Sequence, residues 1–220
     1  MIRRIARIMK KILLGVLLTI TISSPVLAQK RVEPYQLKES SINRVQKTIL
    51  LDLAHHDTPK DEGCSYGGYN EREIAENITL KVKDILESKG ISVQLTRGKD
   101  DVISIAERIA MANSNNYDYY ISIHVNSCEG ENRGTGVEAW SSDAWSLSNK
   151  VLTELSNEFG YENRGIFQTD FYNRRINTKS TILEIGFINN SKDRYNLINH
   201  KDEYAECIAK GIYDQLLGGN

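Results

Sequence analysis

The sequence lacks several features that would place it in common classes of protein. No glycine-rich phosphate loop follows its first predicted strand, which excludes the usual nucleotide-binding α/β domain. Its apolar run at 12–22 is too short to span a bilayer comfortably. Internal repeats and low-complexity blocks are also absent. With 220 residues, 40% of them hydrophobic, the chain is expected to form one well-buried domain.

The first 28 residues are expected to be a secretory signal peptide. A basic start precedes the apolar run, and Val26 and Ala28 are small residues before a cut. No cysteine lies at the cut, which argues against a lipoprotein, and Arg3-Arg4 matches a twin-arginine signal only faintly. We therefore expect export to the cell wall, periplasm or extracellular space, with no stable membrane span after cleavage.

Charge and cysteine content narrow the classes further. Cleavage removes five basic residues and no acidic ones, so the formal net charge moves from −1 to about −6. An acidic chain has no general attraction to nucleic acid. Of the three cysteines, Cys207 lies in an apolar helical pattern and is expected in the core. Cys64 and Cys128 either pair or stay as thiols, which spacing does not decide.

Strand and helix patterns alternate after a polar linker or arm at 29–46. Continuous apolar runs indicate buried strands, and capping pairs such as Ser104 with Glu107 indicate helix starts. This alternation predicts a single α/β domain over 47–220, with a mainly parallel open sheet and helices on both faces. The expected strands are 48–53, 91–95, 119–125, 135–140 and 180–187. Two expected helices are capped at Asn70 and Ser104, and two more have apolar stripes at 147–155 and 204–216.

Ionisable side chains gather where the predicted strands end. His55 and His56 follow the first strand, His124 ends the third, and Glu184 lies in the last. Ligands of open α/β sheets bind at the carboxyl ends of the strands, so these groups are expected to converge. Glu71, at the start of a helix, faces the same loop. Two histidines and a carboxylate from three elements form a zinc shell with one position left for water.

Each of these residues also has a structural interpretation. A strand-end histidine such as His124 is often only hydrogen-bonded, and Glu71 is also favoured by the helix dipole. Glu184 would be costly to bury unpaired, so it needs either an arginine or a catalytic partner. The residues alone leave both interpretations open.

The motifs around these residues resemble those of the zinc-dependent N-acetylmuramoyl-L-alanine amidases with an AmiC-like catalytic domain. Five motifs follow in the family's order, and the likeness runs from about residue 48 to the C-terminus. They are Asp52-Leu-Ala-His55-His56, Glu71-Arg-Glu-Ile74, Leu95-Thr-Arg97, Ser122-Ile-His124-Val-Asn126 and Glu184-Ile-Gly-Phe-Ile-Asn189.

The resemblance implies a function and a role for each matching residue. His55, rather than His56, matches the first zinc ligand, Glu71 and His124 match the other two, and Glu184 matches the catalytic acid and base. The implied reaction is hydrolysis of the amide between N-acetylmuramic acid and L-alanine in peptidoglycan, with Zn²⁺ as cofactor. Because the sequence has no separate wall-targeting domain, a regulatory or recruiting protein is a further expected partner.

The chain departs from the family at two places. The family's Pro-Gly before the histidine is Leu53-Ala54 here, and His56 replaces the following glycine. If a glycine there has a positive φ, either Ala54 is strained or the loop differs. His56 is then a further candidate for binding metal or substrate. A proline that usually precedes the catalytic glutamate is replaced by Lys179-Ser180-Thr181.

Two other functions remain as alternatives at this stage. One is a zinc peptidase that cuts within the stem peptide, and the other is a non-catalytic or partner-regulated peptidoglycan-binding module on the same fold. Several further residues have a binding role and a structural role as alternatives. Asn126 either supports an imidazole or forms a turn, Trp140 and Trp145 either stack on sugar or pack in the interior, and Arg174 and Arg175 either contact a stem-peptide carboxylate or lie in a solvated basic loop.

Overall fold

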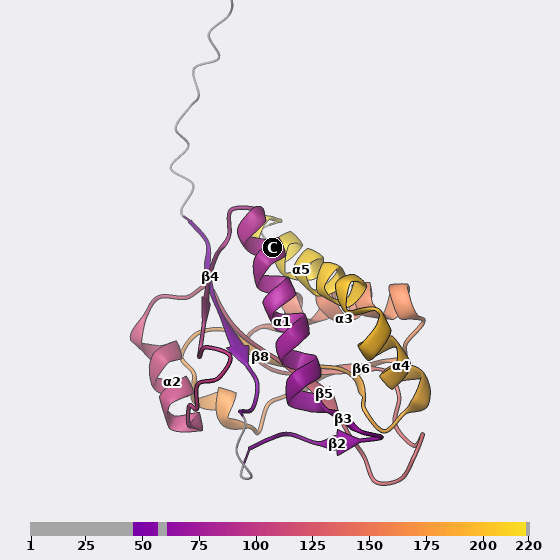
Figure 1. Cartoon of the computed structure of the whole chain (residues 1–220). Coiled ribbons are helices and arrows are strands. Elements are labelled where there is room, and N and C mark those ends of the chain that lie inside the picture. The colour runs from indigo at the N-terminus through magenta and orange to yellow at the C-terminus, as the bar shows by residue number, and fades with distance from the viewer. Residues whose placement is uncertain (1–45, 57–60, 219–220) are drawn as a thin grey trace, which may run out of the picture. The chain divides into compact units, whose positions relative to one another are not determined.

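The computed structural model describes residues 46–56 and 61–218 (Figure 1). The predicted signal peptide and all but the last residue of the predicted arm lie outside these ranges, so both stay predictions. The six-stranded sheet has the order β4-β1-β5-β8-β6-β7. Its strands are β1 (Thr48–Leu53), β4 (Ser92–Leu95), β5 (Tyr119–Asn126), β6 (Val137–Ser142), β7 (Asn163–Gln168) and β8 (Ser180–Phe187).

The direction of the strands divides the sheet into two parts. β4, β1, β5 and β8 are parallel to one another, as expected for strands that read as continuous apolar runs. β6 is antiparallel to β8, and β7 is parallel to β6. The sheet is therefore mainly parallel, as predicted. Its reversed pair brings the amino-terminal end of β6 to the carboxyl end of β8.

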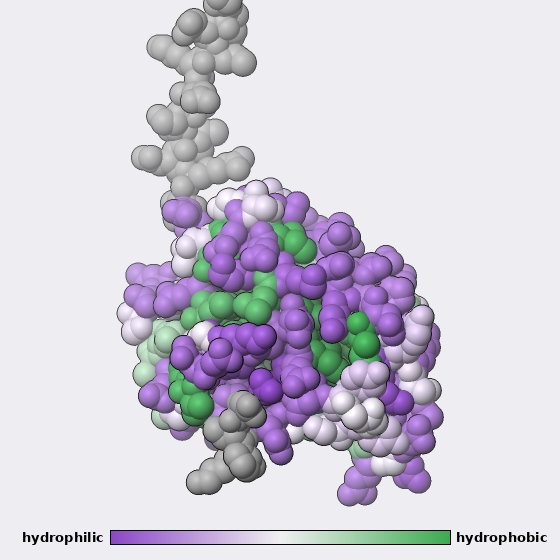
Figure 2. All heavy atoms as spheres, in the orientation of Figure 1, coloured by the Kyte–Doolittle hydropathy of each residue, from purple (hydrophilic) through white to green (hydrophobic). Residues whose placement is uncertain are grey.

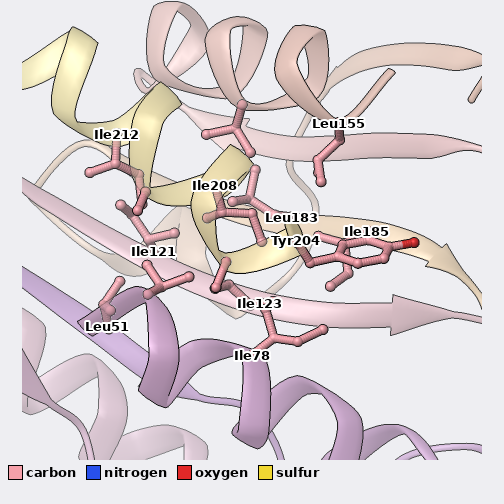
Figure 3. Packing of buried hydrophobic residues seen from close by; sticks show 14 of the residues in the cluster. Leu51, Ile78, Ile121, Ile123, Leu155, Leu183, Ile185, Tyr204, Ile208 and Ile212 are labelled. Carbon is pink, nitrogen blue, oxygen red and sulfur yellow. The ribbon is translucent and has the colours of Figure 1, made fainter. Parts of the chain in front are cut away.

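One face of the sheet packs against three long helices. These are α1 (Glu71–Ser88), α3 (Trp145–Phe159) and α5 (Lys201–Leu217), and α5 packs against both of the others (Figure 1). Figure 3 shows strand residues such as Leu51 and Ile123 meeting Ile78 of α1 and Ile208 of α5. Burial of these branched aliphatic side chains supplies the main favourable free energy of the domain.

The opposite face has a smaller apolar cluster. Leu50 and Tyr120 point to this side and pack with Ala112 of α2 (Ile105–Ser114) and with Tyr172 of the short 3-10 helix η1 (Tyr172–Arg175). Helices thus cover both faces, as predicted. In the view of Figure 2 the surface is mostly hydrophilic, with hydrophobic side chains visible between polar ones.

Five elements were not predicted from the sequence. They are the strand β7, the helix α4 (Ser191–Asn199), the 3-10 helix η1, and the strands β2 (Ser65–Tyr66) and β3 (Tyr69–Asn70), which form a short hairpin. β7 is an edge strand with no buried residue, so it shows no apolar alternation. α4 has Leu197 as its one buried apolar residue. Neither element has the hydrophobic period from which sequence reasoning starts.

Candidate metal centre and active site

The structure brings the three predicted zinc ligands together at the carboxyl end of the sheet. His55 follows β1, His124 lies near the end of β5, and Glu71 is the first residue of α1. Each offers one ligand atom, and these atoms lie within 4.8 Å of one another. Glu71 Oε1 is 3.1 Å from His55 Nε2 and 3.1 Å from His124 Nδ1.

The donor set fits a zinc ion. Buried polar atoms are normally hydrogen-bonded, yet His124 Nε2 is buried without a hydrogen-bond partner among the described residues, and His55 Nε2 meets only the carboxylate of Glu71, at 3.1 Å. Two imidazoles and one carboxylate are the ligand set of many catalytic zinc sites. Asp61 Oδ1 lies 2.7 Å from His55 Nδ1 and orients that ring toward Glu71.

Electrostatics in the cluster favour a bound cation. Burial by itself lowers the pKa of His55, but hydrogen bonds and charge from Glu71 and Asp61 raise it to about 9. Burial raises the pKa of Glu71, and hydrogen bonds from His124 and His55 reverse this and hold it well below its usual value. The carboxylate is therefore charged at neutral pH, and a metal ion would compete with the proton on His55.

Two residues that sequence reasoning missed hold Glu71 in place. Cys64 donates to Glu71 Oε2 from its backbone N–H at 2.9 Å and from its thiol at 3.0 Å. Gly63 has a φ of +72°, and a Cβ atom there would lie 3.0 Å from both Glu71 Oε2 and His55 Cδ2. Oε2 is thus bound to the loop, and Oε1 is left facing the histidines.

Cys64 and Cys128, which the sequence left open as a disulfide or as thiols, do not pair in the structure. Both are free cysteines. Cys128 instead receives a hydrogen bond on its carbonyl oxygen from Asn189 Nδ2 at 3.0 Å. Cys207 of α5 is partly buried against the main core, as its pattern predicted.

Replacing Cys64 by alanine is expected to weaken zinc binding about 10- to 100-fold, because such supporting contacts typically have effects of that size. Zinc affinity is measured by competition with a chromophoric chelator. Cys207→Ala is the matched control and should leave the affinity unchanged, since Cys207 packs against the core in α5. Equal affinity of Cys64→Ala and the wild type would contradict this role.

The backbone of the loop that carries His55 is not strained at Ala54. The positive φ belongs to His55 itself, at 58°, and not to Ala54. Two buried arginines hold this backbone. Arg97 donates to the carbonyl oxygens of Leu53 and His55 at 3.0 and 2.9 Å, and Arg108 donates to the same two oxygens at 2.8 and 3.0 Å.

His56 lies outside the cluster of ligand atoms. Its side chain is buried, and its Nε2 is 3.4 Å from Asp61 Oδ2. Its backbone N–H donates to the carbonyl oxygen of Asp61 at 2.9 Å. Among the described residues, His56 therefore supports the loop through Asp61, and His55 is the histidine that meets Glu71.

Glu184 lies beside the three candidate ligand residues. It is in register with His124 of β5 and with Glu138 of β6, so the three side chains leave the same face of the sheet. Its Oε2 is buried without a hydrogen-bond partner in the described part of the chain. Burial, assisted by the negative charges of Glu71 and Glu138 and opposed by His124, raises the pKa of Glu184 to about 7.

Glu138 is a site residue that sequence reasoning missed. Its Oε1 accepts hydrogen bonds from Asn126 at 3.0 Å and from Trp140 at 3.3 Å, and its Oε2 accepts one from Arg164 at 2.7 Å. Asn126 therefore supports Glu138 rather than an imidazole. The available signal was a glutamate within the predicted strand at 135–140, which becomes informative only once that strand is known to be reversed.

The other residues that the sequence suggested for substrate binding are two tryptophans and two arginines, and they lie in β6, α3 and η1. Trp140 packs against Phe167 and Phe171, with ring centroids 4.9 and 5.2 Å away. Trp145 is half-exposed at the start of α3. Arg174 and Arg175 are exposed in η1, and Arg174 makes a loose pair with Asp170 at 3.8 Å. Among the described residues, no helix is long and apolar enough to cross a membrane.

Comparisons with known proteins agree with this geometry. A family model for N-acetylmuramoyl-L-alanine amidases matches residues 49–214. The uncharacterized protein YqiI of Bacillus subtilis is 29% identical, over 77% of this chain and 86% of its own. Several other curated relatives, among them named amidases, are longer, and the chain spans 35% to 64% of their length.

Two solved structures are similar throughout the described domain. Amidase AmiC2 of Nostoc punctiforme has a TM-score of 0.72 and 27% identity, covering 77% of this chain and 97% of its own. The amidase CwlD from Clostridioides difficile, solved in complex with the lipoprotein GerS, has a TM-score of 0.73 and 26% identity, covering 79% and 100%.

Proposed function

Because the chain belongs to the N-acetylmuramoyl-L-alanine amidase family, we propose that it hydrolyses the amide bond between N-acetylmuramic acid and L-alanine in peptidoglycan, with a zinc ion as cofactor. The observation that supports this most directly is the convergence of His55, Glu71 and His124 within 4.8 Å, beside the unpartnered Oε2 of Glu184. Glu184 is in register with His124, so the ligands and the acid share one face of the sheet.

The residues divide into those that hold the cofactor and one that moves protons. His55, Glu71 and His124 would hold the ion, with Asp61 and Cys64 fixing the orientation of two of these ligands. When bound, zinc supplies Lewis-acid polarisation of a carbonyl and lowers the pKa of a water molecule. Glu184 Oε2 accepts a proton from water and returns it to the departing amine nitrogen.

The pKa of Glu184 suits this task. A group that accepts a proton and then gives it back works best when its pKa is close to the working pH. In the absence of a bound metal ion, burial and the negative charges of Glu71 and Glu138 raise the pKa of Glu184 to about 7, well above that of an ordinary glutamate. Among the described residues Glu184 forms no ion pair with an arginine, and Arg164 pairs with Glu138 instead.

Location and partners follow from the same proposal. Peptidoglycan lies outside the cytoplasm, which agrees with the signal peptide expected at 1–28. The related amidase CwlD was solved together with a lipoprotein. We extend this to the present chain as a proposal that a regulatory or recruiting protein binds it at the wall.

Digestion of purified peptidoglycan tests the function. The zinc-loaded protein is expected to release peptides that begin with alanine and to leave intact glycan chains, as read by mass spectrometry of the products. A sample stripped by a chelator should release neither until zinc is restored. Cuts inside the stem peptide would identify a peptidase instead. A folded protein that binds peptidoglycan without zinc or hydrolysis would identify a binding module.

A further inference from the structure

The row of residues that contains Glu184 runs on to the edge of the sheet at β7. His124, Glu184 and Glu138 are in register on β5, β8 and β6, and Glu138 pairs with Gly165 of β7. The pairing of β6 with β7 shifts at this point, because Val137 pairs with Asn163 while Glu138 pairs with Gly165. Arg164 is the extra residue of this bulge, and bulges redirect side chains.

Arg164 is held in place on two sides. Its Nε donates to Glu138 Oε2 at 2.7 Å, and its guanidinium lies 5.1 Å from the centre of the Phe187 ring. Its side chain is still 37% exposed. Within residues 46–56 and 61–218, its two terminal nitrogens donate to no protein atom. A guanidinium has five N–H donors, so a fixed edge is left to bind a further group.

We propose that Arg164 is a substrate-binding residue that pairs with a carboxylate of the stem peptide, next to the bond that is cut. This rests on the proposed function. The planar edge of a guanidinium matches a carboxylate in a bidentate pair. The sugars of the glycan chain offer hydroxyl and acetamide groups, whereas the peptide carries carboxylates. The positive charge of Arg164 therefore favours binding of the peptide, rather than the glycan, on the β7 side of Glu184.

The spacing favours the second residue of the stem peptide. Neighbouring strands lie ~4.8 Å apart, so β7 is about 10 Å from β8, which carries Glu184. An extended peptide advances ~3.4 Å per residue. The second residue of the stem peptide, which is acidic, thus lies about two residue lengths from the bond that is cut. The arginine side chain spans the remaining distance to β7. The α-carboxylate of this second residue is either free or amidated in peptidoglycan, and Arg164 distinguishes the two forms.

Two matched muropeptides test this subsite, one with a free α-carboxylate on the second residue and one with a carboxamide there. The wild type is expected to prefer the carboxylate in kcat/KM by at least about tenfold, because hydrogen bonds to charged groups are the stronger ones. Arg164→Gln should lose about 10- to 100-fold on the carboxylate substrate, mainly through KM, with little change on the carboxamide.

The controls separate binding from structural support. Lys210→Gln removes an exposed cation of α5 that pairs with Glu154 and Asp214, and it should leave the substrate preference unchanged. Arg164→Lys keeps the charge but loses the planar fork, so it should retain activity with a reduced preference for the carboxylate. This variant keeps the proposal testable if Arg164→Gln folds poorly. Equal losses on both substrates, or a wild type without preference, would overturn the proposal. Failure of the proposed function itself would appear as hydrolysis of neither substrate.

Discussion

Glu184→Gln is expected to slow the release of stem peptides by about 10²- to 10⁴-fold, the range that general acid and base catalysis supplies. Glutamine has nearly the shape of glutamate, but its amide cannot accept and return a proton. Zinc content should stay at the wild-type level, because Glu184 is not one of the three clustered ligand residues. Release is measured by chromatography of soluble peptides and zinc by elemental analysis.

A surface glutamate provides the control for that variant. Glu87 forms an exposed i,i+4 pair with Lys83 in α1, so Glu87→Gln should retain full turnover. Wild-type turnover in Glu184→Gln would show that another group takes the proton. Loss of zinc along with activity would show that Glu184 is a metal ligand, and the division of roles among the four residues would then be wrong.

Asp52→Asn is expected to lower the free energy of unfolding at pH 7 by about 3–5 kcal/mol. Asp52 is buried beneath the His55 loop, where it pairs with Arg108 and accepts hydrogen bonds from Thr96 at 2.6 Å and Ser122 at 2.7 Å. Removing its charge leaves the buried guanidinium of Arg108 uncompensated. Urea denaturation followed by circular dichroism measures the change.

The effect should depend on pH in a defined direction. Burial raises the pKa of Asp52. The charge of Arg108 and the hydrogen bonds from Thr96 and Ser122 outweigh this effect and hold the pKa below its usual value. The stabilisation is therefore fully present above the unfolded-state pKa of about 3.9 and is lost as pH falls through the lower folded-state pKa. The gap between wild type and variant should narrow in acid.

Asp118→Asn is the matched comparison for Asp52→Asn. Asp118 pairs with Lys47 at 2.9 Å, and both side chains are partly exposed. Solvent screens such a pair, so the loss should be no more than about 1 kcal/mol. A similarly small loss for Asp52→Asn would mean that the Arg108 contact contributes little, and that the His55 loop is held mainly by backbone hydrogen bonds.

The sequence predicted those parts of the fold that have a strong hydrophobic period. The strands from β1 to β8 with buried runs, and the helix start at Ser104 with its reciprocal Glu107 bond, are present as predicted. The family and the enzyme class predicted from five ordered motifs are confirmed by the match over residues 49–214. β7 was missed because this edge strand has no buried residue, and Ile166 packs only partly buried against the core.

The site was predictable only where its residues belong to ordered motifs. His55, Glu71 and His124 do, and they converge. Glu138, Arg164 and Cys64 do not, and their positions depend on long-range pairing or on loop geometry. At Ala54 the family motif suggested strain that the structure does not have. The unusual backbone angle falls on His55, and the carbonyl contacts of Arg97 and Arg108 hold it there.

The reversed direction of β6 makes the chemistry of the site depend on strand alignment. Successive strand residues point to opposite sides, so sliding β6 by a single position would exchange Glu138 for Ala139. The carboxylate would then enter the aliphatic layer under α3, and a methyl group would face Glu184. The turn from Gly134 to Gly136 leads directly into β6, which begins at Val137. Gly136 has a φ of +98°, and a Cβ atom there would lie 2.3 Å from the carbonyl oxygen of Glu162.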